Sequence, residues 1–381
     1  PSSWPIPWIQ HSLRCRKSSN IYRQRGIILL RSAKILVCSL LAWAWFSQPA
    51  LGLIPDGEKV YDVSAPRSDA LASVLMEAES GQLLFSENGE TPLPPASTTK
   101  ILTALLALDM TDDLEATDIV SPAAAGVPEC SANLRAGESL SLADLLQGAL
   151  VHSGNDACYA VAEAIAGSEP FFVHWLNMKA AALGAYSVHF TNTNGLPDAE
   201  HLISAEDLAL ITAYALNHDF FRETVDSKYA AIGEDGHYRR FQNTNKLLWQ
   251  DEDIIGVKTG TTDAAGSCLV AAYQKGAACY ISVVLNSHDR YGECYSLLRY
   301  AEENYIRVVM AEPGQALAYA NGRMLYAASR LSAFMEREQA RDLSLAWDID
   351  PQGEKGSLTL LDGGGRELAA IQLTPEPPLV N

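Results

Sequence analysis

The sequence lacks the cysteine spacing that metal sites and disulfide frameworks need. Its seven cysteines include no C-x-x-C pair, and two of them, Cys15 and Cys38, fall in the first 52 residues, which leaves an odd number in the remainder. No H-E-x-x-H segment occurs either. We therefore expect no zinc site, no dense disulfide framework, and no metal or other cofactor.

Basic residues are also scarce over most of the chain. The 381 residues hold 28 basic against 46 acidic side chains, a formal net charge of −18. The first 52 residues carry seven of the basic side chains and no acidic one, so the remainder is more acidic still. This balance argues against a nucleic-acid binder that tracks phosphates. It is typical of the solvated surface of a secreted enzyme.

No apolar run is long enough to span a bilayer. The longest run near the start, residues 35–46, has twelve mostly apolar residues, follows a basic segment and precedes small residues at Ala50 and Gly52. A basic, then apolar, then small-residue order is typical of a secretory signal peptide. We predict that residues 1–52 are a signal peptide with an upstream extension, cleaved after about Gly52, and that the protein is extracytoplasmic, in the cell envelope. A retained membrane anchor is the alternative.

The rest of the chain predicts a mixed architecture. Residues 74–78 and 82–86 read as a hairpin, and the alternating segments 254–259, 267–273 and 279–286 as three consecutive strands. Between them, helical patterns cover 98–108, 142–151, 156–166, 169–182 and 205–217, and a further one covers 293–307. Strands from both ends around a helical middle predict an α+β fold, in which helices and a helical subdomain flank one antiparallel sheet.

The last part of the sequence predicts a second unit. Residues 357–361 and 367–373 read as a hairpin around an Asp-Gly-Gly-Gly turn. We therefore expect a catalytic domain over 53–308 and a small β-rich C-terminal domain over 309–381.

Three short motifs carry chemistry. Each occurs once: Ser97–Lys100 (S-T-T-K), Ser153–Asn155 (S-G-N) and Lys258–Gly260 (K-T-G). Serine and lysine three apart at a helix start share a face, so the amine of Lys100 reaches the oxygen of Ser97 and can take its proton. That role needs a lowered lysine pKa, which we expect from burial in the apolar helix and from the nearby charge of Lys258.

The same motifs predict the other parts of an acyl-transfer site. The amide N–H groups of Ser97 and Thr261 are the candidate oxyanion hole. Ser153 offers a hydroxyl that relays a proton to a leaving amine, and Asn155 can hydrogen-bond a substrate amide. Lys258 and Thr259 end a strand, where they present a positive charge and a hydroxyl to a substrate carboxylate.

Together these segments resemble the D-alanyl-D-alanine carboxypeptidases, the low-molecular-mass penicillin-binding proteins of the serine β-lactamase/transpeptidase-like superfamily. The likeness covers roughly residues 70–306 and includes the longer segments 94–101, 152–157, 201–209 and 256–266. The resemblance implies an acyl-enzyme on Ser97 with Lys100 as its base, a peptidoglycan stem peptide ending in D-Ala-D-Ala as substrate, and covalent binding of β-lactams. It assigns the second motif to Ser153 and Asn155, and the grip on the terminal carboxylate to Lys258, Thr259 and Gly260.

The resemblance also implies a peripheral association with the membrane or cell wall. Many members end in an amphipathic membrane helix, but the proline-rich residues 374–381 do not predict one.

Four other functions were weighed. A class A β-lactamase would need a glutamate for deacylation, and no E-x-x-x-N lies between Asn155 and Lys258. A Ser-His-Asp hydrolase would need a G-x-S-x-G elbow, which is missing. A silent sensor that binds peptidoglycan or β-lactams, and a D,D-transpeptidase, would carry the same three motifs and stay open as alternatives.

Overall fold

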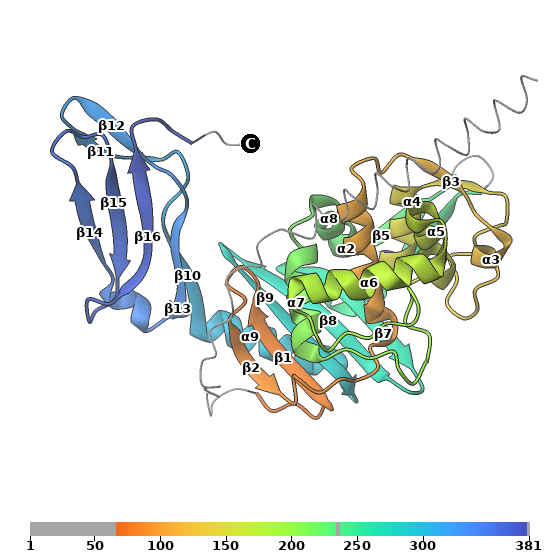
Figure 1. Cartoon of the computed structure of the whole chain (residues 1–381). Helices are drawn as coiled ribbons and strands as arrows, with labels where there is room; N and C mark the ends of the chain where they lie inside the picture. Colours follow the sequence, from red (N-terminus) through yellow and green to blue (C-terminus); the bar gives the residue numbers. More distant parts are fainter. Residues whose placement is uncertain (1–65, 234–236, 379–381) are drawn as a thin grey trace, which may run out of the picture. The chain divides into compact units, whose positions relative to one another are not determined.

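The computed structural model describes residues 66–233 and 237–378 (Figure 1). The predicted signal peptide and its cleavage point after Gly52 lie outside the described residues. Among the helices that are described, none combines the length and the apolar character needed to cross a bilayer.

An antiparallel sheet of five strands, in the order β2-β1-β9-β8-β7, forms the centre of the catalytic part. Its strands are β1 (Ala72–Glu77), β2 (Leu83–Glu87), β7 (Ile254–Thr262), β8 (Gly266–Lys275) and β9 (Ala278–Ser287). β1 pairs with β9 in register from Ala72 opposite Leu285 to Glu77 opposite Tyr280. The sheet is thus assembled from both ends of the domain, as predicted, and β7 lies at its edge.

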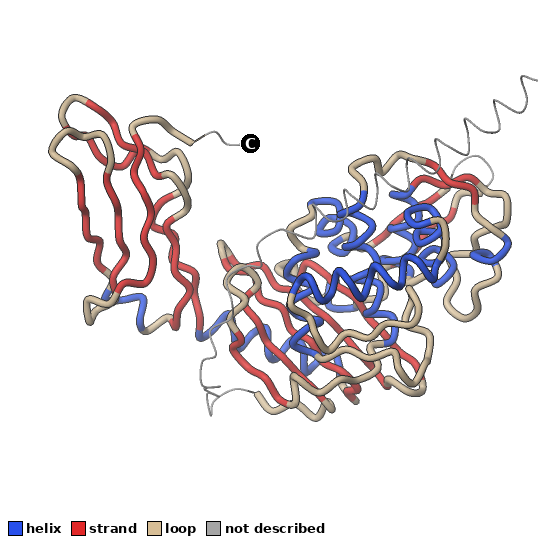
Figure 2. The backbone as a smooth tube through the Cα atoms, in the orientation of Figure 1, coloured by secondary structure: helices blue, strands red, loops and turns tan. Residues whose placement is uncertain are grey.

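Successive side chains along the strands point to opposite faces of the sheet and are buried in two separate hydrophobic cores. On one face, Leu75 and Leu269 pack with α9 (Arg290–Asn304). On the other face, Val74 and Val270 join a larger cluster with the helical part, whose blue helices gather over the sheet in Figure 2. These helices are α2 (Lys100–Met110), α3 (Pro122–Ala125), α4 (Leu142–Gln147), α5 (Asn155–Ala166), α6 (Glu169–Leu183), α7 (Ala205–Ala215) and α8 (Asp219–Asp226), with shorter turns η1 (Ala96–Thr99) and η2 (Gly148–His152). A third turn, η3 (Lys246–Trp249), packs in the core on the α9 face.

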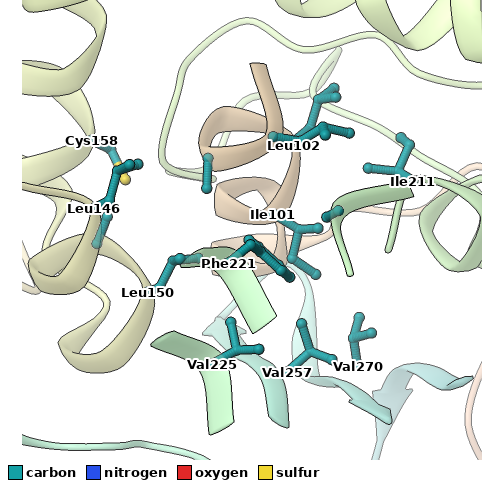
Figure 3. Packing of buried hydrophobic residues seen from close by; sticks show 14 of the residues in the cluster. Ile101, Leu102, Leu146, Leu150, Cys158, Ile211, Phe221, Val225, Val257 and Val270 are labelled. Atoms are coloured by element: carbon teal, nitrogen blue, oxygen red, sulfur yellow. The ribbon is translucent and has the colours of Figure 1, made fainter. Parts of the chain in front are cut away.

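Helix α2 is buried almost all round, as its sequence predicts. Ile101 and Leu102 are at most 1% exposed and pack in one cluster with Phe221 of α8, Val257 of β7 and Val270 of β8 (Figure 3). Close packing from several elements holds α2 in one position relative to β7. The first motif is thereby fixed against the strand that carries the third motif.

Several small elements were not predicted. They include α3, α8 and two short hairpins, β3 (Thr117–Ile119) with β4 (Ser139–Ser141) and β5 (Tyr229–Ile232) with β6 (Arg239–Gln242). All three residues of β3 are exposed, so no alternation of apolar and polar residues marks it. Strands this short give too little periodicity to be recognised.

The helix predicted over 293–307 begins earlier and ends sooner. It runs from Arg290 to Asn304, and the chain then continues as β10 (Tyr305–Ala311), which pairs with β13 (Leu331–Glu336). The end of that prediction was wrong because Tyr305 and Arg307 are buried alternately with more open neighbours, a period of two. β10 crosses the predicted boundary between 308 and 309, so the division into 53–308 and 309–381 stays a prediction.

The C-terminal residues form a second antiparallel sheet with its own core. Its order is β11-β12-β16-β15-β14, and Leu325, Leu358 and Leu360 are buried in it. Its strands are β11 (Ala316–Ala320), β12 (Arg323–Ala327), β14 (Ser344–Ile349), β15 (Gly356–Leu361) and β16 (Glu367–Thr374), with a short turn η4 (Gln339–Asp342). β15 and β16 confirm the hairpin predicted around residues 362–365.

Candidate active site

The first motif forms a tight turn that leads directly into α2. η1 covers Ala96–Thr99, and α2 begins at Lys100. The hydroxyl of Thr98 donates to the carbonyl of Pro95, and that of Thr99 donates to the carbonyl of Ala96, with a donor–acceptor distance of 2.8 Å in each bond. Ser97 itself is half-buried, with Oγ 2.8 Å from Nζ of Lys100. The structure therefore brings Ser97 and Lys100 together at the helix start.

Lys100 is completely buried and held by three oxygen atoms. Besides Ser97 Oγ, its Nζ contacts Oδ1 of Asn155 at 2.8 Å and the main-chain carbonyl of Asn194 at 2.7 Å. Burial lowers the pKa of Lys100, because an ammonium group loses its hydration there, while nearby acidic groups such as Asp156 act in the opposite direction. Burial is thus the leading cause, and the predicted lowering by Lys258 is not among the main ones.

The second motif meets the first through Asn155. Both ends of its side-chain amide are occupied, because Oδ1 accepts from Lys100 and Nδ2 donates to the carbonyl of Pro128. Ser153 lies between η2 and α5 in a left-handed conformation, with φ of 72°. Among the described residues, its hydroxyl makes no hydrogen bond to Ser97 or to either lysine of the motifs. In this structure Asn155 therefore positions Lys100, and its contact with a substrate amide stays a prediction.

Asp156 was not recognised from the sequence as part of the site. It is fully buried, and its carboxylate accepts four hydrogen bonds with distances of 2.6–3.0 Å. The donors are the main-chain amides of Ala132, Leu134 and Ala157 and the hydroxyl of Ser131. These bonds fasten the loop over 128–134 to the start of α5. The same loop supplies the carbonyl that holds Asn155. In the sequence, Asp156 appears only as an aspartate in the first turn of a helix. Such a residue commonly stabilises a helix by its charge alone, so its role in the site is not evident from the sequence.

The third motif lies inside the edge strand β7, which continues to Thr262, so Lys258 and Thr259 do not end a strand as predicted. Lys258 is 1% exposed, and its Nζ donates to the carbonyl of Thr259 over 3.0 Å. Burial, reinforced by the charge of Lys100, lowers the pKa of Lys258 to about 7. Because the repulsion between two charges is mutual, each lysine disfavours the charged form of the other, and burial is the leading cause at both. Thr259 is buried, and its hydroxyl pairs with that of Thr244 at 2.6 Å.

Gly260 allows β7 to approach the nucleophile turn. A Cβ atom at this position would lie 2.8 Å from the carbonyl oxygen of Pro95 and 3.0 Å from the amide nitrogen of Ser97. Only a residue without a side chain fits there. The main chain of the third motif thus comes into direct contact with the turn that bears Ser97, which places Thr261, the next residue of β7, at the same end of the strand.

Arg290, at the first position of α9, is a second residue that sequence reasoning missed. Its Nη1 donates to the carbonyl of Gly260 over 2.8 Å and to the hydroxyl of Thr261 over 2.7 Å. Its guanidinium group lies 5.1 Å from the ring centre of Tyr291. No spacing rule connects a residue of α9 to β7, because the contact depends on the tertiary fold. Arg290 adds a positive charge beside the third motif.

No grouping of three or more His, Cys, Asp or Glu side chains suited to a metal ion occurs within residues 66–233 and 237–378. The groups gathered at the site are a serine hydroxyl, a buried amine, a second buried amine with an arginine nearby, and amides at a helix start. Such a set of groups is suited to acyl transfer through a covalent serine ester.

Comparison with known proteins agrees with this chemistry. The family model described as peptidase S11, D-alanyl-D-alanine carboxypeptidase, matches residues 59–289. The chain is 32% identical to D-alanyl-D-alanine carboxypeptidase DacF of Bacillus subtilis over 268 residues, and the match spans 66% of this chain and 66% of that protein.

Two solved structures illustrate the shared fold. Penicillin-binding protein 6B from Escherichia coli superposes with a TM-score of 0.67 at 26% identity, covering 84% of this chain and 99% of that one. The Streptomyces K15 DD-transpeptidase gives a TM-score of 0.59 at 28% identity, covering 63% of this chain and 99% of that one. The fold predicted from the sequence, that of the β-lactamase/transpeptidase-like proteins, is confirmed. The chain belongs to the D-alanyl-D-alanine carboxypeptidase family of serine peptidases.

Proposed function

We propose that the protein is a serine-type D-Ala-D-Ala carboxypeptidase, which removes the terminal D-alanine from peptidoglycan stem peptides through an acyl-enzyme on Ser97. The observation that carries this proposal is the 2.8 Å contact between the hydroxyl of Ser97 and the amine of a fully buried lysine. Membership of the D-alanyl-D-alanine carboxypeptidase family supports the choice of substrate.

The surroundings of Lys100 suit it to be the base. A neutral amine has two N–H donors and one lone pair. The amide oxygen of Asn155 and the carbonyl of Asn194 can only accept, so they take both donors. The lone pair is then left for the hydroxyl of Ser97. Because burial disfavours the ammonium form, Lys100 can remove the proton from Ser97 as its oxygen attacks the carbonyl of the penultimate D-alanine.

The third motif suits a substrate that ends in a carboxylate. A carboxylate beside Lys258 would favour the protonated form of the lysine and raise its pKa from about 7. Binding of the carboxylate and protonation of Lys258 would therefore favour each other. Thr259 supplies a hydroxyl, and Arg290 adds a second positive charge at the same end of β7. As an edge strand, β7 also has main-chain groups that can pair with an extended peptide.

The remaining steps use groups around Ser97. The oxyanion formed on the attacked carbonyl lies between the amides of Ser97 and Thr261. Ser153 relays the proton that Lys100 took from Ser97 to the departing nitrogen as the C–N bond breaks and D-alanine leaves, so Lys100 is neutral again. Water then attacks the ester, which releases the shortened peptide and restores the hydroxyl of Ser97. β-Lactams, as mimics of D-Ala-D-Ala, form the same ester on Ser97.

We place the protein outside the cytoplasm, in the cell envelope, with a catalytic part followed by a β-rich part. A substrate in the cell wall requires an extracytoplasmic enzyme, which agrees with a signal peptide over residues 1–52. We assign catalysis to residues 53–308 and leave residues 309–381 as a β-rich accessory domain. A peripheral association with the membrane or cell wall belongs to the same proposal.

The test is release of D-alanine from a soluble peptide ending in D-Ala-D-Ala, measured with wild type and with Ser97→Ala. The proposal predicts turnover by wild type and none by the variant. Folded wild type that releases no D-alanine but is labelled once by a β-lactam would favour a silent sensor. Release only when an amine acceptor is added would favour a transpeptidase. Rapid turnover of the β-lactam itself would favour a β-lactamase.

A further inference from the structure

A buried histidine, His201, connects two segments on either side of Lys100. It is 2% exposed and lies just before α7. Its Nε2 is 2.8 Å from the hydroxyl of Thr99, and its Nδ1 accepts from the main-chain amide of Thr191 over 3.1 Å. Thr99 is the residue before Lys100, whereas Thr191 begins the loop over 191–196. His201 therefore bridges the nucleophile turn and this loop.

The direction of these hydrogen bonds is determined by their end groups. A main-chain amide can only donate, so Nδ1 of His201 must be an acceptor. The hydrogen of the neutral ring is then on Nε2, which donates to Thr99, and Thr99 in turn donates to the carbonyl of Ala96 over 2.8 Å. Burial lowers the pKa of His201 to about 4, in keeping with a neutral ring. Stacking on Phe190, with ring centres 4.4 Å apart, fixes the ring plane.

The loop on the other side of His201 delivers an acceptor to Lys100. Its residue Asn194 provides the carbonyl that accepts from Nζ over 2.7 Å. The neighbouring Thr193 is held by Glu169, which accepts from its amide over 3.1 Å and from its hydroxyl over 2.8 Å. Gly195 is required at its position, since a Cβ there would lie 1.8 Å from the carbonyl oxygen of Ala96. The loop and the nucleophile turn therefore fit against each other with no room for adjustment.

We propose that His201 is a positioning residue for the acylation step: by bridging Thr191 and Thr99, it holds the turn bearing Ser97 and the carbonyl of Asn194 at the separation that directs the lone pair of Lys100 to Ser97. This inference rests on the proposed function. His201 touches neither Ser97 nor Lys100 through any hydrogen bond that the structure contains, so it acts through Thr99 and the loop.

The test uses variants that remove one end of the bridge at a time. The amide of Asn can replace the Nδ1 acceptor but does not reach Thr99, so His201→Asn removes the bond to Thr99. The longer Gln carries its N–H near the position of Nε2, so His201→Gln keeps the bond to Thr99 and removes the acceptor for Thr191. Thr99→Val removes the same bond from its other end. Thr212→Val is the matched control, because it deletes an equally buried hydroxyl bonded to a carbonyl over 2.7 Å in α7.

For each variant we would measure kcat and KM for D-alanine release, the rate of acylation by a fluorescent penicillin, and the midpoint of thermal unfolding. Assays would be run well below the lowest midpoint. We expect His201→Asn and Thr99→Val to lower kcat and acylation about 10- to 100-fold, with KM changed less than about threefold, since small misplacements of reacting groups cost this much. The double variant should be no slower than Thr99→Val alone, which also loses the bond from Thr99 to the carbonyl of Ala96. His201→Gln, which lacks the acceptor for Thr191, should be slowed by a similar factor, because the bridge needs both of its ends.

Several results would overturn this role. Losses in His201→Asn and Thr99→Val that multiply in the double variant would show that the two residues act separately. A His201→Gln variant as fast as wild type would show that the bond to Thr191 is not needed, and losses no larger than that of Thr212→Val would reduce the effect to general stability. If wild type is acylated but releases no D-alanine, the proposed function fails while the acylation rates still decide on His201. Wild type that is neither acylated nor active would overturn both.

Discussion

The buried lysine of the third motif makes a quantitative prediction about stability and pH. In the folded protein the pKa of Lys258 is about 7, whereas a lysine in an unfolded chain titrates near 10.4. Between these two values the unfolded chain binds one proton more than the folded protein at this site. The free energy of unfolding must therefore rise with pH across this window, by about 1.4 kcal/mol per pH unit. Burying Lys258 therefore costs stability at pH 7 and below, and this cost becomes smaller as the pH rises toward about 10.4.

The perturbation is Lys258→Met, which keeps an unbranched side chain of similar length and removes the titrating group. The difference in free energy of unfolding, wild type minus variant, should rise by about 2 kcal/mol between pH 7.5 and pH 9. Burial lowers the pKa of Lys100 in wild type and in the variant, so taking the difference between the two removes that contribution. The matched control is Lys246→Met, since Lys246 is exposed and its ammonium group stays in water.

The assay is urea unfolding at a series of pH values, followed by both circular dichroism and tryptophan fluorescence to check that the transitions coincide. We expect the two curves of stability against pH to diverge for Lys258→Met and to run parallel for Lys246→Met. Parallel curves for both variants would refute the reasoning, because they would mean that Lys258 titrates alike in the folded and unfolded chains.

Three further predictions follow from contacts in the site. Gly260→Ala should slow acylation by a fluorescent penicillin at least about 100-fold, because its Cβ meets the nucleophile turn, whereas Gly276→Ala, with nothing within 4 Å of its Cβ, should leave the rate within about threefold. Asp156→Asn should lower the free energy of unfolding by about 2–3 kcal/mol in urea titrations, since an amide cannot accept all the bonds that the carboxylate accepts; an unchanged value would contradict the account of the loop over 128–134. At pH 8 a neutral alkylating reagent should modify the exposed Cys130 in the folded protein and spare Cys294, whose thiol pKa burial raises to about 12, as peptide mapping would reveal; equal labelling would contradict this.

Much of the site could be anticipated from side-chain spacing, but its main-chain groups could not. Ser97 and Lys100 are three residues apart at a helix start, and helical geometry alone brings them together. The carbonyl of Asn194, which holds Lys100 as closely as Asn155 does, carries no residue-specific signal, since any residue would provide it. The same applies to the amides that bind Asp156. Its importance arises from a loop more than twenty residues earlier in the chain.

The fold shows the same limit. Long periodic segments such as α2 and β8 were predicted because many residues repeat one pattern. The change from α9 to β10 at Tyr305 was missed, because the residue at the junction gives no break such as glycine or proline, and only pairing with β13 makes a strand there. Burial of Lys100, predicted from the apolar helix, is the leading cause of its lowered pKa, and the share contributed by the charge of Lys258 stays a prediction.

The central claim is that Ser97 forms a covalent ester with the acyl part of the substrate. The most direct measurement is mass spectrometry of the intact protein after brief incubation with a labelled β-lactam, followed by digestion to locate the adduct. The account predicts one adduct per chain, on Ser97, which is absent in Ser97→Ala and formed more slowly in Asn155→Ala, where Lys100 loses an acceptor. An adduct on any other residue, or an undiminished adduct in Ser97→Ala, would contradict it.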